Sequence, residues 1–225
     1  MIKKVFQKIL KKSGKSYSID SRIPSNLFFQ ILFERSLMMT RGIVCLRKKV
    51  FLGSKCSIRN KKNVFFGKNV TIDKGTTIDA FAYEKVVIGD GSRIGAYSLV
   101  TSTSHMSKYG KGLKIGKNTA IGRFSEFGAS GGIEIGNDVI MGSYISFHSE
   151  NHNFKNKNLL IREQGVTSKG IKLGNNIWVG AKVTFLDGCE IGDNSVIAAG
   201  AVINGKFPAN SVIGGVPAKI IKSID

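Results

Sequence analysis

The chain is poor in the residues that mark disulfide frameworks, metal clusters and membrane spans. Its 225 residues include three cysteines, three prolines, three histidines and one tryptophan. Cys45, Cys56 and Cys189 are odd in number and share no metal-ligand spacing, so they suit a reducing compartment better than a disulfide framework. No apolar run reaches the roughly 18 residues of a membrane helix, and lysines interrupt the first apolar residues, so we expect neither a span nor a cleavable leader.

Acidic residues are also scarce, with 15 Asp and Glu against 34 Lys and Arg and a formal net charge of +19. A nucleic-acid partner is not predicted, because the basic residues are spread along the chain and no basic-aromatic recognition motif or recognition helix appears. The same positive potential favours small phosphorylated ligands or anionic lipid surfaces.

A six-residue repeat dominates what is present. In six stretches an aliphatic or Phe residue recurs three times at a step of six, often followed by Gly. These positions are Phe66, Ile72, Ile78; Ile88, Ile94, Val100; Ile115, Ile121, Phe127; Ile135, Met141, Phe147; Leu173, Val179, Phe185; Ile191, Ile197, Ile203. Such a period predicts a parallel β-helix with three flat faces, each hexad giving one short strand and one corner where Gly relieves the tight turn. Six coils at a spacing of about 4.8 Å predict a prism about 29 Å tall.

Residues outside the repeat predict where loops and extensions lie. Leu46, Leu52 and Ile58 keep the step of six and predict one or two earlier coils. Extra residues always follow the third hexad of a coil, so the loops should leave at one corner. The largest insertion, about residues 153–172, begins just after His148-Ser149-Glu150-Asn151-His152, and a long excursion of this kind typically builds a binding edge.

The N-terminal region differs in character from the repeat. In residues 1–12 five apolar side chains fall on one helical face and five lysines on the other. This pattern leaves two alternatives open: a peripheral helix on an anionic membrane, or a cap on the open end of the solenoid. Residues 25–39 predict a second helix, expected to be buried rather than interfacial because apolar residues wrap most of its circumference. The expected organisation is a basic helical extension (1–45), a β-helix (46–205) and a C-terminal cap or short helix (206–225).

Four motifs resemble those of the hexapeptide-repeat acetyltransferases. They are Asn151-His152, the run from Ile171 to Gly180 (IKLGNNIWVG), the run from Ile191 to Val202 (IGDNSVIAAGAV), and the close from Ile213 to Lys222 (IGGVPAKIIK). Within that superfamily the chain is most similar to sugar O-acetyltransferases, namely the galactoside, maltose, nodulation-factor, capsule and O-antigen enzymes. The resemblance implies a left-handed coil, a cytoplasmic homotrimer with sites between prisms, acetyl-CoA as donor, no metal, and a saccharide or lipid-linked saccharide as acceptor.

The resemblance also implies a role for individual residues. His152 matches the general base, and histidine suits the role because it exchanges a proton near neutral pH; the plain alternative is a surface histidine. Contacts to coenzyme A map to Trp178, Ala181, Ala199, Lys206, Lys219 and Lys222. The alternative interpretation of the lysines is a solvated basic tail that binds no ligand.

Acceptor contacts are less clearly marked than donor contacts. Relatives carry a polar residue, often Asn, on the coil before the histidine, and this chain has no Asn in residues 123–127. Ser125 is the expected replacement, and Glu150 is expected to orient the imidazole of His152 or to bind sugar hydroxyls; a solvent-facing role is open for both.

The other histidines allow competing interpretations. His148 is expected to be a corner residue. His105 lies two coils before His152, about 10 Å along the axis, so the two could not share a zinc ion within one chain, although ligation across chains, as in the gamma-class carbonic anhydrases, stays open. The predicted function is saccharide O-acetylation during assembly of a bacterial surface polysaccharide. Two alternatives are N-acetylation of a nucleotide-linked amino sugar and a non-catalytic trimeric scaffold.

Overall fold

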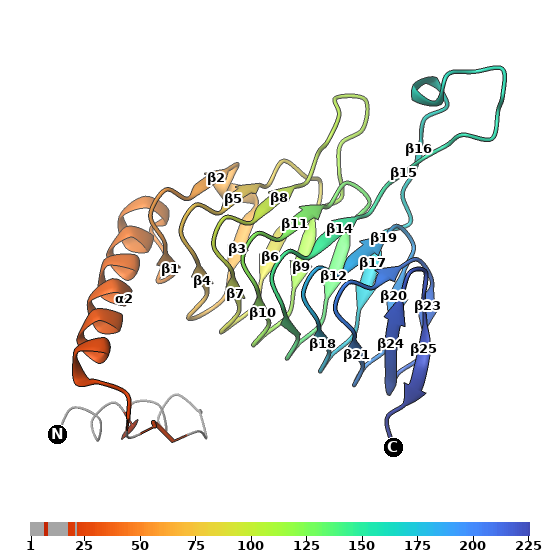
Figure 1. The fold of residues 1–225 in the computed structure, drawn as a ribbon. Helices are drawn as coiled ribbons and strands as arrows, with labels where there is room; N and C mark the ends of the chain where they lie inside the picture. Colours follow the sequence, from red (N-terminus) through yellow and green to blue (C-terminus); the bar gives the residue numbers. More distant parts are fainter. Residues whose placement is uncertain (1–6, 9–17, 21) are drawn as a thin grey trace.

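The computed structural model describes residues 7–8, 18–20 and 22–225, and in them the chain winds through three sheets in turn (Figure 1). The first face contains β1 (Phe51–Leu52), β4 (Thr71–Ile72), β7 (Arg93–Ile94), β10 (Ala120–Ile121), β13 (Ile140–Met141), β18 (Trp178–Val179), β21 (Val196–Ile197), β24 (Ser211–Gly215) and β25 (Ala218–Ser223). The second face contains β2 (Ser57–Arg59), β5 (Thr77–Asp79), β8 (Leu99–Thr101), β11 (Glu126–Gly128), β14 (Ser146–His148), β19 (Thr184–Leu186) and β22 (Val202–Ile203). The third face contains β3 (Val64–Phe66), β6 (Val86–Ile88), β9 (Leu113–Ile115), β12 (Ile133–Ile135), β17 (Ile171–Leu173), β20 (Glu190–Ile191) and β23 (Lys206–Phe207).

The hexad positions form the core of this parallel β-helix. Each pairs with its counterpart in the next coil, as Ile72 does with Ile94 and Ile94 with Ile121. All of the eighteen are buried except Phe66, which is half-buried. On the second face the rings of Phe127, Phe147 and Phe185 stack at centroid distances of 4.9 and 4.7 Å. The predicted fold class and register are therefore confirmed.

The glycines that follow the hexad positions have a different role from the one expected. They do not take the left-handed conformation; the residue two positions later does, as at Asn118 (φ 53°) and Tyr144 (φ 61°). The glycines are needed because backbones of successive coils approach closely. A Cβ at Gly89 would lie 2.5 Å from the carbonyl carbon of Gly116, which allows no larger residue.

The N-terminal end of the solenoid begins with one extra coil. Leu52 and Ile58 lie in β1 and β2, as the step of six predicts, and the 3-10 turn η1 (Lys61–Asn63) leads into β3. Leu46, however, is the last residue of helix α2 (Ser25–Leu46), so no coil forms there. The predicted helix therefore exists but is longer than residues 25–39.

Helix α2 lies beside β1 at the end of the solenoid (Figure 1). The expectation that it would be buried is wrong, because only Phe28 and Gly42 of its residues are buried. One side of the helix meets the first coil, where the Arg35 guanidinium lies 3.7 Å from the centroid of the Phe51 ring. The predicted helix of residues 1–12 lies outside the described residues, apart from residues 7–8.

Two excursions leave the prism where the second face passes to the third, here called the second–third edge. One connects β8 to β9, and the other contains the antiparallel strands β15 (Asn151–His152) and β16 (Val166–Thr167) with the 3-10 turn η2 (Ile161–Glu163). Figure 1 shows both projecting from the same side of the solenoid. The prediction that insertions share one corner is confirmed.

The C-terminal end is closed by a β-hairpin. Strand β24 extends the first face beside β21, and β25 turns back antiparallel to it. Residues 206–225, all described, contain strands and no helix, so the cap is a hairpin rather than a short helix. Among the described residues no helix is both long and apolar enough to cross a membrane.

Candidate active site

His152 lies at the base of the long hairpin on the second–third edge. Its strand β15 pairs with β16, placing His152 opposite Val166. The side chain is exposed, and within residues 7–8, 18–20 and 22–225 its ring has no hydrogen-bond partner. An imidazole in this state can accept a proton from a ligand without first giving up a bond to its own chain.

Two buried contacts fix the start of the hairpin next to His152. The Ser149 hydroxyl donates to the Gly128 carbonyl oxygen at 2.6 Å and accepts from the Gly131 amide at 2.9 Å. Ser149 itself is fully buried. The chain therefore leaves the prism from a rigid point three residues before His152, which limits how far the imidazole can move.

A polar cluster joins the two excursions. The Lys108 ammonium, from the β8–β9 loop, donates to the Ser168 hydroxyl and lies 3.9 Å from a Glu150 carboxylate oxygen. The Ser168 hydroxyl in turn donates to Glu150 at 3.4 Å. Glu150 thus faces Lys108 and Ser168 in this structure, rather than the imidazole it was expected to orient.

Asp187 holds the other end of the excursion. Its Oδ1 atom accepts hydrogen bonds from the backbone amides of Lys169 and Gly170, at 2.7 and 2.8 Å. Neither Asp187 nor Lys108 was identified from the sequence. Lys108 lies in the β8–β9 loop and Asp187 in the corner after β19. The six-residue period does not specify the path of either segment, so the sequence carries no signal for these two contacts.

The positions expected to contact the donor lie elsewhere on the prism. Trp178 is exposed on the first face, and Ala181 and Ala199 are exposed where the first face passes to the second, here called the first–second edge. Lys219 and Lys222 are exposed on β25, and Lys219 is paired with Gly214. A Cβ at Gly214 would lie 3.0 Å from the Ala198 Cβ, so the lysine strand borders this edge.

Lys206 does not join this group. It lies on the third face, where its ammonium contacts a Glu190 carboxylate oxygen at 2.8 Å. That hydrogen bond is the main reason why the pKa of Glu190 falls below its ordinary value. The expectation that Lys206 lies beside the other donor positions is therefore wrong, because the last coil carries it to a different face.

Ser125 was expected to contact the acceptor, and this expectation is also wrong. Its side chain is only 1% exposed, and its hydroxyl donates to the Gly122 carbonyl oxygen at 3.0 Å inside the corner between β10 and β11. Ser195 does the same with Gly192 in the corner between β20 and β21. Ser125 therefore stabilises the corner, and its buried hydroxyl is not accessible to an acceptor.

One chain does not bring His152 and the positions expected to contact the donor together. Ala181 precedes β19 on the first–second edge, whereas His152 follows β14 on the second–third edge. Crossing the second face from Ala181 to Leu186 takes five residues, or about 16 Å at about 3.3 Å per residue. A transferred acetyl group cannot span this width.

The histidines do not form a metal site in the described part of the chain. His105 lies in the β8–β9 loop, with its Nδ1 2.7 Å from the Ser107 hydroxyl oxygen. His148 pairs with Gly128 and Leu186 on the second face and is exposed at the corner, as expected. No group of three or more His, Cys, Asp or Glu side chains among the described residues could hold a metal ion.

Comparisons with known proteins show similarity to acetyltransferases. Residues 170–205 match the family model described as bacterial transferase hexapeptide (six repeats). A probable acetyltransferase of Mycobacterium tuberculosis is 28% identical over 136 residues, covering 60% of this chain and 43% of that protein. The galactoside O-acetyltransferase of Escherichia coli is 31% identical over 118 residues, covering 52% of this chain and 57% of the enzyme.

Solved structures show the same fold. A variant of AntD, an N-acyltransferase from Bacillus cereus crystallised with dTDP and coenzyme A, superposes with a TM-score of 0.59 at 20% identity, covering 77% of this chain and 86% of that one. Against the curated relatives, the chain spans only about half of their length, 43% and 57% for the two named above. The resemblance to the hexapeptide-repeat acetyltransferases and their parallel β-helix is confirmed.

Proposed function

We propose that this hexapeptide-repeat chain is an acetyl-CoA-dependent acetyltransferase that acts on a saccharide, with His152 as general base. The observation that carries the proposal is the exposed imidazole of His152, which is held beside a buried anchor and has no partner of its own among the described residues. The similarity to acetyltransferases, among them a galactoside O-acetyltransferase, supports the reaction class.

The proposed reaction is direct transfer. The imidazole of His152 takes the proton of the sugar hydroxyl as its oxygen attacks the thioester carbonyl carbon. The tetrahedral intermediate collapses with loss of the thiolate of coenzyme A, which recovers the proton from the imidazolium. The pantetheine arm would lie along Ala181 and Ala199, whose small exposed side chains leave room for it, with Trp178 beside them. Lys219 and Lys222 would bind the nucleotide phosphates.

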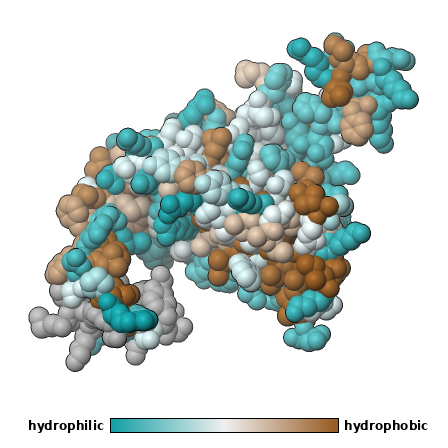
Figure 2. Space-filling view, viewed as in Figure 1, coloured by the Kyte–Doolittle hydropathy of each residue, from teal (hydrophilic) through white to brown (hydrophobic). Residues whose placement is uncertain are grey.

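We further propose that the active unit is a homotrimer. His152 and the donor positions lie on opposite edges of the second face, so a histidine from one copy must meet the donor edge of another. A closed ring of three copies supplies three such sites, because each copy offers one edge of each kind. Figure 2 shows hydrophobic residues at the tip of the long hairpin, away from its own solenoid. These exposed side chains, suited to contact a neighbouring copy, are Phe154, Leu159, Leu160 and Ile161.

The finer assignment is O-acetylation during assembly of a bacterial surface polysaccharide, in the cytoplasm, with the basic segment of residues 1–12 in peripheral contact with an anionic membrane. Glu150 would contribute to acceptor binding from beside His152. N-acetylation of a nucleotide-linked amino sugar is the second candidate, because an amine can replace the hydroxyl at the same base and because the similar AntD fold is that of an N-acyltransferase.

The deciding experiment is thiol release from acetyl-CoA with neutral sugars, amino sugars, sugar phosphates, nucleotide-sugars and oligosaccharides as acceptors. Product mass and linkage then distinguish an ester from an amide. We expect acceptor-dependent thiol release and an ester product. An amide product would favour the second candidate, and failure of every acceptor to stimulate thiol release would favour the non-catalytic scaffold.

A further inference from the structure

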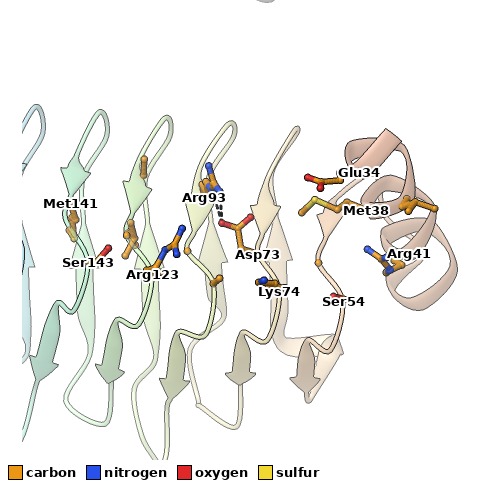
Figure 3. Close-up of a pocket in the computed structure, with 17 residues that line it drawn as sticks. Glu34, Met38, Arg41, Ser54, Asp73, Lys74, Arg93, Arg123, Met141 and Ser143 are labelled. Carbon is orange, nitrogen blue, oxygen red and sulfur yellow. Dashed lines mark hydrogen bonds and ion pairs between the residues drawn. The ribbon is translucent and has the colours of Figure 1, made fainter. Parts of the chain in front are cut away.

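A charged groove lies between helix α2 and the first face, apart from His152. It encloses about 620 Å³. Figure 3 shows α2 at one end and successive strands of the first face along its floor. Gly95 and Gly122, which have no side chain to fill the groove, lie on this floor. Its ionisable lining is Glu34, Arg41, Asp73, Lys74, Arg93 and Arg123.

Positive charge is left uncompensated in this groove. Asp73 is already paired with Arg93, at 2.6 Å. Glu34 accepts a hydrogen bond from the neutral Gln30 side chain at 3.3 Å and keeps its negative charge. The lining therefore carries four basic and two acidic side chains, and positive charge exceeds negative charge by two. Arg41, Lys74 and Arg123 have no carboxylate partner among the described residues. Desolvation of the guanidinium first, and then the positive charge of Arg93, lowers the pKa of the neighbouring Arg35. An anion entering the groove would meet three available cations.

The groove runs along the first–second edge. Lys74 follows β4, Arg123 follows β10 and Ser143 follows β13, each at the corner that Ala181 occupies after β18. Arg123 is two coils and Lys74 four coils from Ala181, which corresponds to about 10 and about 19 Å at a coil spacing of about 4.8 Å. The groove and the proposed pantetheine positions, Ala181 and Ala199, therefore lie one after the other along the first–second edge.

We propose that this groove binds a phosphoryl group of the acceptor, so that the acceptor is a saccharide carrying a phosphate or diphosphate. This inference rests on the proposed acetyl transfer. With the reacting hydroxyl near Ser143 and Ala181, the distance to the cations leaves room for one to a few sugar units. Guanidinium and ammonium groups are the usual partners of phosphate oxygens. Two cations on different coils, Lys74 and Arg123, and a third on α2, Arg41, match a diphosphate better than a single carboxylate.

The nucleotide phosphates of the donor have a different place. The donor positions Ala199, Lys219 and Lys222 lie on the C-terminal side of Ala181, whereas the groove lies on its N-terminal side. A donor and a phosphorylated acceptor could therefore meet end to end near Ala181. The imidazole of a neighbouring copy would enter between them in the proposed trimer.

Calorimetric titration of the full chain with sodium pyrophosphate tests the assignment without requiring turnover. We expect the wild type to bind, and Lys74→Gln and Arg123→Gln each to weaken binding about tenfold, because each removes a charged hydrogen-bond donor. Lys117→Gln, at an exposed corner away from the groove, and His152→Ala should bind as the wild type does. Affinity should also fall as salt concentration rises.

Two results would overturn the proposal: wild-type protein that does not bind pyrophosphate, or groove variants that bind it unchanged. A parallel titration with coenzyme A separates the two sources of phosphate. We expect Lys74→Gln and Arg123→Gln to leave coenzyme A affinity unchanged, and a loss there would assign the groove to the donor instead. Binding of pyrophosphate by a protein that fails every acetyl-transfer assay would defeat the proposed function but not the anion site.

Discussion

The proposed trimeric site can be tested by combining two inactive variants in one assembly. His152→Ala removes the base but leaves the donor edge intact. Ala181→Phe fills the exposed corner where the pantetheine arm would lie but leaves His152 intact. About 16 Å of the second face separates the two positions in one chain, so neither substitution should disturb the other site directly.

The expected recovery follows from the geometry of a closed ring. A site is complete only where an intact histidine of one copy faces an intact donor edge of the next. In a trimer holding both variants, either two of one kind or two of the other, one neighbour pair in the ring satisfies this condition. Mixed trimers should therefore show about one third of wild-type turnover, against nearly none for either variant alone.

The assay requires co-expression with two different affinity tags and tandem purification, followed by measurement of thiol release from acetyl-CoA. Light scattering should give the mass of a trimer, and thermal melting should show that both variants fold. If mixed trimers are as inactive as the separate variants, base and donor positions act within one chain and the intersubunit site is wrong. A monomeric or dimeric mass would refute the ring itself.

Three further predictions concern single regions. Cys189→Ser should retain full turnover and intersecting initial-rate patterns, because burial raises the pKa of the Cys189 thiol to about 12 and leaves it protonated at neutral pH; ping-pong kinetics with a trapped acetyl-thioester would contradict direct transfer. Ser125→Ala should lower stability by about 1 kcal/mol in urea unfolding, since it removes the buried bond to Gly122, with no change in the acceptor KM; a raised KM would return Ser125 to the site. Deleting residues 1–12 should abolish salt-sensitive flotation with anionic liposomes but spare acetyl transfer to a soluble acceptor; unchanged flotation, or a lowered melting temperature in a protein that never binds liposomes, would favour a solenoid cap.

The repeating part of the fold could be predicted from the sequence because its physics is local. An apolar residue such as Ile94 points inward because burial removes its side chain from water. The step of six then determines its partners in the neighbouring coils, Ile72 and Ile121. Predictions from the six-residue period were wrong where the repeat ends. Leu46 fits the step of six, yet it is the last residue of helix α2 and forms no strand.

The site was harder to predict because it depends on contacts between irregular segments. The motif around His152 located the hairpin, but Lys108 reaches Ser168 and Glu150 from a different loop, which no spacing along the chain reveals. Ser125 and Lys206 were assigned from their positions along the chain. In the structure the Ser125 hydroxyl is bonded inside a corner, and Lys206 lies on the third face, away from the other donor positions. The groove beside α2 combines residues from the helix and from successive coils, so it became visible only in three dimensions.

The most direct test of the account is the turnover of His152→Ala beside His148→Ala, measured as thiol release from acetyl-CoA with the best acceptor found. We predict that His152→Ala lowers kcat by roughly 100-fold to 10,000-fold, the usual contribution of a general base, while coenzyme A affinity and the melting temperature stay near wild type. His148→Ala should keep most of its turnover. An active His152→Ala protein beside an inactive His148→Ala protein would contradict the assignment of the base.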